Sequence, residues 1–519
     1  MKKLPIGLQT FSHLIEQNCV YVDKTAIIHH LITQGSYYFF SRPRRFGKSL
    51  LVSTLAAIFS GKKELFAGLA ISNMPYEWKK HPVVMISFAG ISHATPEALE
   101  SGIKLCLQDI ADDYHVIIDR SLSPGAMLRS LVRKLAVENS VVLLVDEYDY
   151  SILSNIHEPE VAEKIREVLR DFYAVIKDLD PYLRFTFLTG VSRFSKTSIF
   201  SGLNNLEDIS LSDQYNSLVG YTKSELVDYL QEHFITISKK LDMSLDKLFE
   251  EVKVWYDGYR FTREEAFDPV YNPFSVLLFL KNGSFSNYWF ETGTPTFLIK
   301  LLKTRHYPMQ KFESIEATAG ELGQFEIDDI DLKTLLFQTG YLTIKSYDHE
   351  TRNYVLGYTN KETIDGLSEN IIKSMVGIAR SDASKTAIEL FKAFVQFDCD
   401  KIFALLTHFF AGIPYTIQIG EEKYYQTIFY LILKMMGADI IVEYPTNIGR
   451  IDAVLQTKDT YYIIEFKIDS TAIKAIEQIE NKKYYQPYEN NGKKIILVGI
   501  AFDTTARNVS EIEYKNHLA

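Results

Sequence analysis

The fold of the N-terminal part of this chain is decided by the stretch Arg42-Pro43-Arg44-Arg45-Phe46-Gly47-Lys48-Ser49. It follows an apolar run, residues 37–40, that predicts a buried strand, and it precedes residues 50–59, whose apolar positions recur at helical spacing. A loop between a strand and the N-terminus of a helix is a setting that binds phosphate, because the backbone amides of the new helix point at the anion.

Three residues of this stretch carry the expected chemistry. Gly47 lets the backbone curl around a phosphate, Lys48 reaches its outer oxygens, and the Ser49 hydroxyl can ligate Mg²⁺. The usual pattern has another glycine five residues before Gly47, and Arg42 occupies that position here. The strand, loop and helix context favours phosphate binding; the alternatives are a structural turn or a degenerate loop.

The bulk composition is that of an ordinary globular protein. The chain has 519 residues, enough for about three domains, of which 46% are hydrophobic and 24% charged. It contains no run of about 18 apolar residues and no apolar stretch near Met1, so we expect a cytoplasmic protein without a membrane partner. Its 3 cysteines are too widely spaced to predict a zinc site, so the ligands of any bound metal are expected to be carboxylates. The net charge of −10 means that nucleic acid would need a local basic patch.

Three further apolar runs, residues 83–88, 141–145 and 183–189, are separated by helix-length segments. Such short, almost continuously apolar runs are typical of parallel strands that are covered on both faces. We therefore expect a doubly wound α/β domain over residues 1–220, with its site at the carboxyl ends of the strands.

Polar residues follow two of these runs. After the second, Asp146 is placed to hold a Mg²⁺ shell and Glu147 to polarise an attacking water, with a solvated strand end as the alternative. After the third, Thr189 is placed to sense a γ-phosphate and Arg193 to neutralise its charge, in cis or towards a neighbouring subunit of a homo-oligomer. An ordinary loop arginine is the alternative. Residues 21–32 are placed to wall a nucleotide base or to pack on the sheet.

Together, residues 41–49, 144–149 and 188–195 resemble the AAA-ATPase-like family of prokaryotic proteins, itself similar to STAND-type and archaeal P-loop ATPases. The resemblance covers roughly residues 1–280, and the family's loop also tends to lack the first glycine. It implies an ATP-binding, ATP-hydrolysing protein. The expected nucleotide-binding residues are Arg44, Arg45, Gly47, Lys48, Ser49 and Asp146, with Glu147 and Arg193 as catalytic residues.

Residues 221–412 predict a mostly helical middle region. Within it, residues 332–337 read as a helix, and residues 340–344 and 354–358 read as a β-hairpin, an arrangement that suggests a winged-helix-like lid. No motif in this region predicts catalysis. Residues 413–519 then predict a separate domain with the order αβββαβ. Its elements are expected at residues 422–436, 440–444, 450–455, 461–467, 471–485 and 494–500.

The register of the hairpin in this last domain brings acids together. If Lys458-Asp459 is a two-residue turn, Asp452 lies opposite Glu465, and Lys467 shares their face because side chains alternate along a strand. Two carboxylates this close repel unless a divalent cation compensates them. The alternative is an exposed polar face, but residues 463–466 are mostly apolar and mark a buried strand, where charges are costly.

Residues 415–505 resemble the PD-(D/E)XK nuclease superfamily, which implies a restriction-endonuclease-like fold. Asp452, Glu465 and Lys467 match its signature, although Ile451 stands where many members have proline. The resemblance implies that Glu422, Asp452 and Glu465 hold Mg²⁺ or Mn²⁺, that Lys467 positions or deprotonates the attacking water, and that Gln478 matches a glutamine of the following helix. Nearby lysines contact a nucleic-acid backbone or are simply solvated; they are Lys474, Lys482, Lys483, Lys493 and Lys494.

The sequence thus predicts an ATP-regulated, metal-dependent nuclease that prefers DNA over RNA. The rival hypothesis is a signalling or scaffold ATPase whose nuclease-like domain binds nucleic acid or a partner without cleaving. The intact signature at Asp452, Glu465 and Lys467 favours the enzyme, and the net charge of −10 favours the rival.

Overall fold

The computed structural model describes residues 1–517 except 195–198, 200–202, 204, 294–297, 299–308, 324–330, 377–379, 414–421, 435–437, 447 and 490. The chain forms two compact units. The first comprises Met1–Gly293 and Ser314–Asn360, and the second comprises Thr294–Glu313 and Lys361–Ala519. The three-part division expected from the sequence stays a prediction.

The first unit is built on a parallel sheet of five strands in the order β2-β3-β4-β1-β5. The strands are β1 (Tyr37–Ser41), β2 (Val83–Ser87), β3 (Val141–Asp146), β4 (Leu183–Gly190) and β5 (Glu207–Asp208). Strand β3 is buried along its whole length, as its continuous apolar run predicts. This confirms the expected parallel sheet, and its order places the loop after β1 beside the end of β4.

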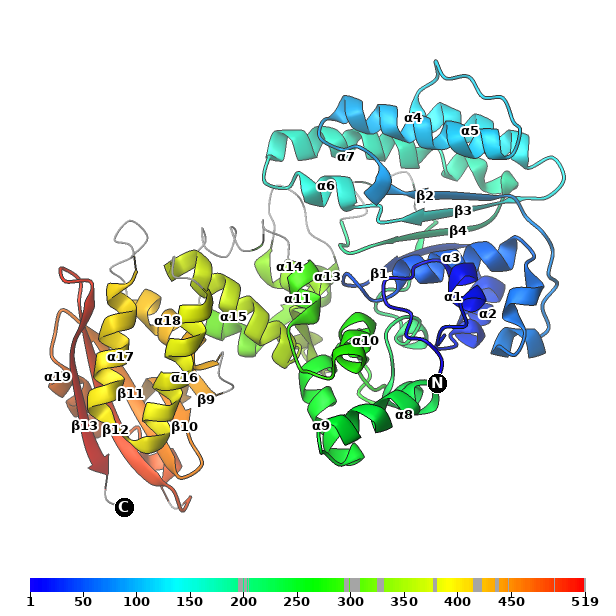
Figure 1. Ribbon diagram of the computed structural model, residues 1–519. Coiled ribbons are helices and arrows are strands. Elements are labelled where there is room, and N and C mark those ends of the chain that lie inside the picture. The colour runs from blue at the N-terminus through cyan, green and yellow to red at the C-terminus, as the bar shows by residue number, and fades with distance from the viewer. Residues whose placement is uncertain are drawn as a thin grey trace. The chain divides into compact units, whose positions relative to one another are not determined.

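Helices cover both faces of this sheet. Figure 1 shows α4, α5 and α7 along one face and α3 along the other. The helices of this part are α1 (Phe11–Glu16), α2 (Thr25–Gln34), α3 (Lys48–Phe59), α4 (Pro96–Asp113), α5 (Pro124–Leu135), α6 (Tyr150–Ser154) and α7 (Pro159–Ala174). Helix α4 begins where Thr95 caps the amide of Ala98 and proline occupies the first helical position, a combination that favours a helix start.

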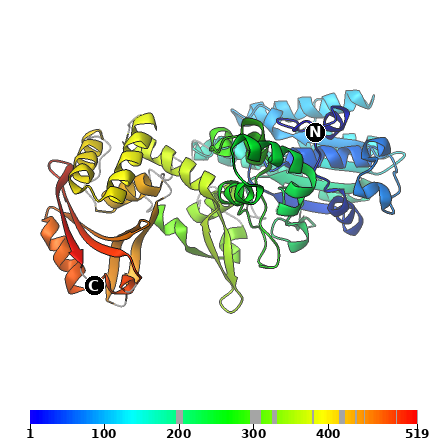
Figure 2. The ribbon, with the colours of Figure 1, turned by 60° about the horizontal axis from the view of Figure 1, so that its bottom comes forward.

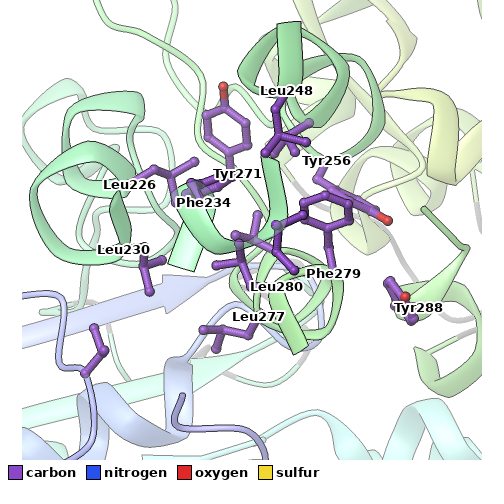
Figure 3. Close-up of a cluster of buried hydrophobic side chains, with 14 residues drawn as sticks. Leu226, Leu230, Phe234, Leu248, Tyr256, Tyr271, Leu277, Phe279, Leu280 and Tyr288 are labelled. Atoms are coloured by element: carbon purple, nitrogen blue, oxygen red, sulfur yellow. The ribbon is translucent and has the colours of Figure 1, made fainter. Parts of the chain in front are cut away.

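A helical region follows the sheet in the first unit. Its helices are α8 (Lys223–Lys240), α9 (Leu245–Tyr256), α10 (Pro273–Asn282) and α11 (Tyr288–Gly293). Helix α8 starts in a capping box between Thr222 and Glu225. Figure 3 shows how Phe234, Tyr256 and Phe279 bring α8, α9 and α10 around one buried hydrophobic cluster.

The first unit also contains a small antiparallel sheet of three strands in the order β6-β8-β7. Its elements are β6 (Ile315–Thr318), α13 (Ala319–Gly323), α14 (Leu332–Thr339), β7 (Leu342–Asp348) and β8 (Asn353–Tyr358). The helix and the hairpin predicted here are present. Helix α14 ends at Gly340, whose φ of 93° suits glycine, and an added Cβ there would lie 2.8 Å from Pro43 Cγ. The turn between α14 and β7 therefore packs against the loop after β1.

The second unit pairs a helical layer with a mixed sheet in the order β13-β12-β11-β10-β9. Figure 2 shows helices α16, α17 and α18 on one face of the sheet and α19 on the other. The elements are α15 (Lys361–Val376), α16 (Arg380–Gln396), α17 (Cys399–Ala411), α18 (Glu422–Lys434), β9 (Asp439–Thr446), β10 (Gly449–Gln456), β11 (Thr460–Ile468), α19 (Ala472–Asn481), β12 (Lys494–Asp503) and β13 (Asn508–His517). This confirms the restriction-endonuclease-like order within the α/β class. The end of the helix expected to reach residue 436 lies outside the described residues.

Strand β13 is absent from the predicted order. It is an edge strand whose residues are mostly exposed and polar, so its sequence lacks the apolar run that identified the other strands. Short 3₁₀ helices complete the description at Lys63–Phe66, Ala70–Asn73, Phe88–Gly90, Lys177–Tyr182, Asp213–Tyr215, Met309–Glu313 and Gln486–Tyr488. Among the described helices, none has the length and apolar character needed to cross a membrane.

Candidate functional sites

The loop after β1 has the local geometry of a phosphate site. Gly47 has a φ of 92° and lies directly before Lys48, the first residue of α3. Lys48 is buried, and its Nζ donates to the carbonyl oxygens of Arg42 and Pro43 at 2.9 Å each. Burial lowers the pKa of Lys48, while Asp146 and Glu147 oppose that effect. A buried cation within a loop at a helix N-terminus is suited to binding phosphate oxygens.

Arg42, at the position of the missing first glycine, has a structural role. Its guanidinium donates to the carbonyl oxygens of Ser210 at 2.6 Å and Tyr215 at 3.3 Å. The group lies 4.4 Å from the ring centroid of Phe40 and 4.0 Å from that of Phe261. Burial lowers the pKa of Arg42 to about 9. The arginine therefore anchors the loop to later parts of the chain.

Two acids at the end of β3 face this loop. Asp146 is buried, the Ser49 side chain is close enough to lower the pKa of its carboxyl, and its Oδ1 has no hydrogen-bond partner among the described residues. Burial raises the pKa of both Asp146 and Glu147. Ser49 and Asp146 thus fit a Mg²⁺ ion, because a hydroxyl and a carboxylate oxygen without a partner are ligands that this ion accepts.

Asp149, which was not among the predicted site residues, ties the end of β3 to the end of β4. Its Oδ2 accepts hydrogen bonds from the amides of Val191 at 3.0 Å and Ser192 at 2.6 Å, and also from the Ser192 hydroxyl. An added Cβ on Gly190 would lie 2.4 Å from Asp149 Oδ1, so this approach requires glycine. The sequence did contain a signal for this residue, because Asp149 is the third acid in the short run that begins with Asp146 and Glu147.

The structure places Arg193 in an ion pair. Its Nη2 lies 2.6 Å from Asp208 Oδ2, and the two side chains are 14% and 19% exposed. The Arg193 amide donates to Gln338 Oε1 of α14 at 2.9 Å. Thr189 is fully buried, and its carbonyl accepts the amide of Tyr148 at 3.1 Å. Ser195, the last residue of that motif, lies outside the described residues.

A cavity of about 320 Å³ opens beside the phosphate loop. Its lining includes Arg44, Arg45, Gly47, Lys48, Ser49 and Glu147, whereas neither Asp146 nor Arg193 lines it. Its apolar walls include Ile6, Val22, Ile28 and Phe274. The segment predicted to wall a base thus contributes Tyr21, Val22, Lys24 and Ile28 to the cavity. A cavity of this size with both charged and apolar lining residues is suited to a nucleotide-sized ligand.

Two lining residues are held from outside the loop. Lys24 Nζ pairs with both carboxylate oxygens of Glu225, at 2.6 and 2.7 Å, although burial lowers its pKa. The Arg44 carbonyl accepts a hydrogen bond from Trp289 Nε1 at 3.0 Å. Neither contact was predicted, because each joins residues about two hundred positions or more apart in sequence.

The second unit brings its predicted residues together. The ladder of β10 and β11 runs through Ala453↔Ile464 to Gln456↔Tyr461, which is the register deduced from the sequence. One step further, Asp452 Oδ2 accepts the amide of Phe466 at 2.8 Å. Glu465 is 2% exposed, and its Oε1 accepts Lys467 Nζ at 3.1 Å and the Gln478 side-chain amide.

The acids of this site affect one another's pKa values. Burial is the largest cause that raises the pKa of Asp452, followed by the charge of Glu465, with a smaller contribution from Glu422. Burial also raises the pKa of Glu465, which Lys467 opposes. Glu422, the first residue of α18, accepts a hydrogen bond from Gln426 Nε2 at 3.1 Å.

A metal ion fits part of this arrangement. Glu465 Oε2 is buried and has no hydrogen-bond partner among the described groups, which leaves an acceptor facing Asp452. Over the described residues, however, no group of three or more His, Cys, Asp or Glu side chains is arranged to hold a metal ion. A cation bound by Asp452 and Glu465 would therefore need water or a movement of Glu422 to complete its ligands.

A glycine of β12 allows helix α19 to lie close to the acids. Gly499 of β12 pairs with Glu465 of β11, and an added Cβ on Gly499 would lie 2.1 Å from the Ala472 carbonyl oxygen. The start of α19 therefore rests on the backbone of β12 next to Glu465. This close contact allows Gln478 to reach the Glu465 carboxylate.

Comparisons with known proteins find matches to both parts of the chain. A family model described as a predicted AAA-ATPase matches residues 5–200, and one of the PD-(D/E)XK nuclease superfamily matches residues 420–512. The "uncharacterized protein in vnfD 5'region" of Azotobacter chroococcum mcd 1 is 39% identical over 521 residues, which covers 98% of each chain. No solved structure matches.

Proposed function

The chain belongs to the family of predicted AAA-ATPases that end in a PD-(D/E)XK nuclease superfamily domain, and from this premise we propose that it hydrolyses ATP and cleaves nucleic acid. ATP occupies the cavity of the first unit. Lys48 binds its outer phosphates, and apolar lining residues such as Val22 and Phe274 receive its base. The observation that carries this proposal is the cavity, because its lining combines the residues of the phosphate loop with apolar side chains.

Hydrolysis follows from the acids at the end of β3. Glu147 lines the cavity, and burial raises its pKa, so it is suited to orient a water and accept its proton. Ser49 and Asp146 would hold a Mg²⁺ ion, which supplies positive charge for the phosphate oxygens when bound. The protein's own contribution is then to hold the nucleotide and the water in line.

The ATPase proposal predicts two distinguishable variants. Lys48→Ala should weaken ATP binding about 10-fold or more, because it removes the cation that meets the phosphates, whereas Glu147→Gln should bind ATP normally and hydrolyse it slowly. Calorimetric titration and phosphate release measure the two effects. The control is Lys63→Ala, an exposed lysine outside the cavity. Equal ATP affinity in Lys48→Ala and wild type contradicts the proposal.

We place nucleic-acid cleavage at Asp452, Glu465 and Lys467, with DNA preferred over RNA. Asp452 and Glu465, joined by Glu422, would hold Mg²⁺ or Mn²⁺, which supplies a Lewis acid for the scissile phosphate when bound. Lys467 positions the attacking water or takes its proton, and Gln478 fixes the Glu465 carboxylate. The observation that carries this proposal is the buried, unpaired oxygen of Glu465 beside Asp452.

The nuclease proposal predicts that substitutions of the acids and of the lysine have different effects on metal binding and cleavage. Asp452→Asn and Glu465→Gln should lose Mn²⁺ binding and cleavage together, because each removes a negative ligand. Lys467→Ala should keep Mn²⁺ binding, while cleavage falls about 10²-fold or more. The measurements are calorimetric Mn²⁺ titration and cleavage of linear and circular DNA and of RNA. Asp459→Asn, in the exposed turn of the same hairpin, is the control.

One observation favours a second function, in which this domain binds nucleic acid or a partner without cleaving it. The described residues offer no group of three acidic, His or Cys side chains arranged for a metal, and Lys467 already pairs with Glu465. Wild-type protein that retains DNA or a partner but fails to cleave any substrate with Mg²⁺ or Mn²⁺ would support this signalling or scaffold function.

A further inference from the structure

The arginine expected to neutralise the γ-phosphate already has a partner. Arg193 is held by Asp208 at 2.6 Å, and Asp208 lies on β5, beside β1. The Arg193 amide is fixed by Gln338 as well. Because both charges of the ion pair are mostly buried, removing Arg193 from Asp208 would leave a buried carboxylate without its cation, which is costly.

Arg44 lies in a different environment. It lines the cavity together with Lys48 and Glu147, and it is only partly buried. Within the part of the chain that the structure describes, no acidic side chain forms an ion pair with its guanidinium. Burial raises the pKa of Glu147 and lowers that of Lys48; the Arg44 charge opposes the first shift and adds to the second.

The backbone of Arg44 is also fixed in place. Trp289 of α11 donates its indole N–H to the Arg44 carbonyl at 3.0 Å, and the Trp289 ring packs against Tyr341 with a centroid distance of 5.1 Å. Arg45, the next residue, differs: it is exposed, has a φ of 66°, and places its guanidinium 5.0 Å from the ring centroid of Phe274. The two adjacent arginines thus both line the cavity but have different contacts.

We propose that Arg44 is the catalytic cation of ATP hydrolysis and that Arg193 is a structural residue. This inference rests on the proposed ATPase function. Water attacks the γ-phosphorus, a new P–O bond forms, and the bond to the β,γ-bridging oxygen breaks so that ADP leaves with the electron pair. The water's proton passes to Glu147, and the Arg44 guanidinium donates hydrogen bonds to the γ-phosphoryl oxygens as their charge redistributes.

The test separates binding of the nucleotide from stabilisation of the transition state. Arg44→Ala should bind ADP within a few-fold of wild type, yet turn over ATP about 10² to 10³-fold more slowly. It should also fail to form the tight complex of ADP with aluminium fluoride that mimics the transferring phosphoryl group. Arg44→Lys, which keeps a cation but loses the planar fork, should fall between the two and guards against misfolding of the alanine variant.

Three further variants separate the role of Arg44 from the roles of other arginines. Arg45→Ala should weaken ATP binding, and Arg193→Ala should lower the unfolding temperature while the aluminium fluoride complex still forms. Arg129→Ala, at an exposed pair with Asp178, is the neutral control. If Arg44→Ala forms that complex like wild type, or if Arg193→Ala alone loses it, Arg44 is not the catalytic cation. If wild type itself neither hydrolyses ATP nor forms the complex, the proposed ATPase function fails and this inference with it.

Discussion

Buried charged residues define both sites at the scale of single side chains. Lys48 and Asp146 lie in the first unit and Glu465 in the second, and each is almost fully buried. Burying a charge is unfavourable unless partners compensate it. Lys48 has two carbonyl partners, whereas Asp146 Oδ1 and Glu465 Oε2 have no hydrogen-bond partner among the described groups. The two carboxylate oxygens are therefore the atoms that most need a cation.

One buried acid outside these sites gives a prediction about pH. Asp257 ends α9, and burial raises its pKa to about 6. The folded protein thus keeps this proton to a higher pH than the unfolded chain does, so stability falls as pH rises from about 4 through 6. We expect the free energy of unfolding to fall by on the order of 2 kcal/mol from this residue alone, at about 1.4 kcal/mol per pKa unit.

Urea unfolding at pH 4.5 and 7.5, chosen as points roughly on either side of this window, measures the effect. Asp257→Asn cannot ionise, so its stability should depend less on pH than that of wild type. Glu264→Gln, at an exposed acid that does not affect the pKa of Asp257, should keep the wild-type dependence. Equal slopes for Asp257→Asn and wild type would show that Asp257 does not titrate in this range.

At the scale of elements, strand and helix ends assemble the sites. In the first unit, Asp149 ties β3 to β4, and Gln338 ties the loop after β4 to α14. In the second unit, α19 rests on Gly499 of β12 and supplies Gln478 to Glu465. Each link joins two elements through one side chain or one missing side chain, so single substitutions should separate them.

Gly499→Ala should move α19 away from the sheet. The new Cβ would meet the Ala472 carbonyl oxygen at 2.1 Å, a contact that can be relieved only by a backbone shift. We expect a loss of about 1–3 kcal/mol in unfolding free energy and weaker Mn²⁺ binding, because Gln478 loses its hold on Glu465. Thermal unfolding and Mn²⁺ calorimetry measure both.

The matched control is Gly90→Ala, where an added Cβ has no atom within 4 Å. It makes the same chemical change without a clash and should leave stability near that of wild type. If Gly499→Ala unfolds and binds Mn²⁺ like this control, the position of α19 does not depend on the glycine.

At the scale of the whole molecule, the two sites lie in two separate compact units of one chain. We predict that nucleotide state changes the rate of cleavage at the second site, because closure of the first unit around ATP can shift the equilibrium of a linked element. Cleavage should differ at least about 3-fold between ATP and ADP, a difference of roughly 0.7 kcal/mol.

The Glu147→Gln variant should hold ATP without hydrolysing it, so it gives the rate of DNA cleavage in the ATP-bound state. The measurement is cleavage of one DNA substrate with ATP, with ADP and without nucleotide, in wild type and in this variant. The control is Asp452→Asn, which should hydrolyse ATP as wild type does because its substitution lies in the other unit. Identical cleavage rates in all nucleotide states would mean that the two units act independently.

Local sequence patterns were enough to predict many of the strands and the residues at their ends. Continuous apolar runs identified β1, β3 and β4, and the register of the β10–β11 hairpin followed from one turn and the alternation of side chains. The acids at the end of β3 and the pair Asp452 and Glu465 could be found in this way because the residues of each set lie on one strand or on adjacent strands of a hairpin.

Tertiary structure alone decided what surrounds these residues. Only the folded chain brings Trp289 to Arg44, Glu225 to Lys24 and Asp208 to Arg193, because these contacts join segments with no common local pattern. The tertiary structure also shows why Arg42 stands where the usual pattern has glycine: its buried guanidinium binds the Ser210 carbonyl and packs on the Phe261 ring. Sequence determined which groups are present at the strand ends; the packing of distant segments decided which of their charges are already paired and which stay free for a ligand.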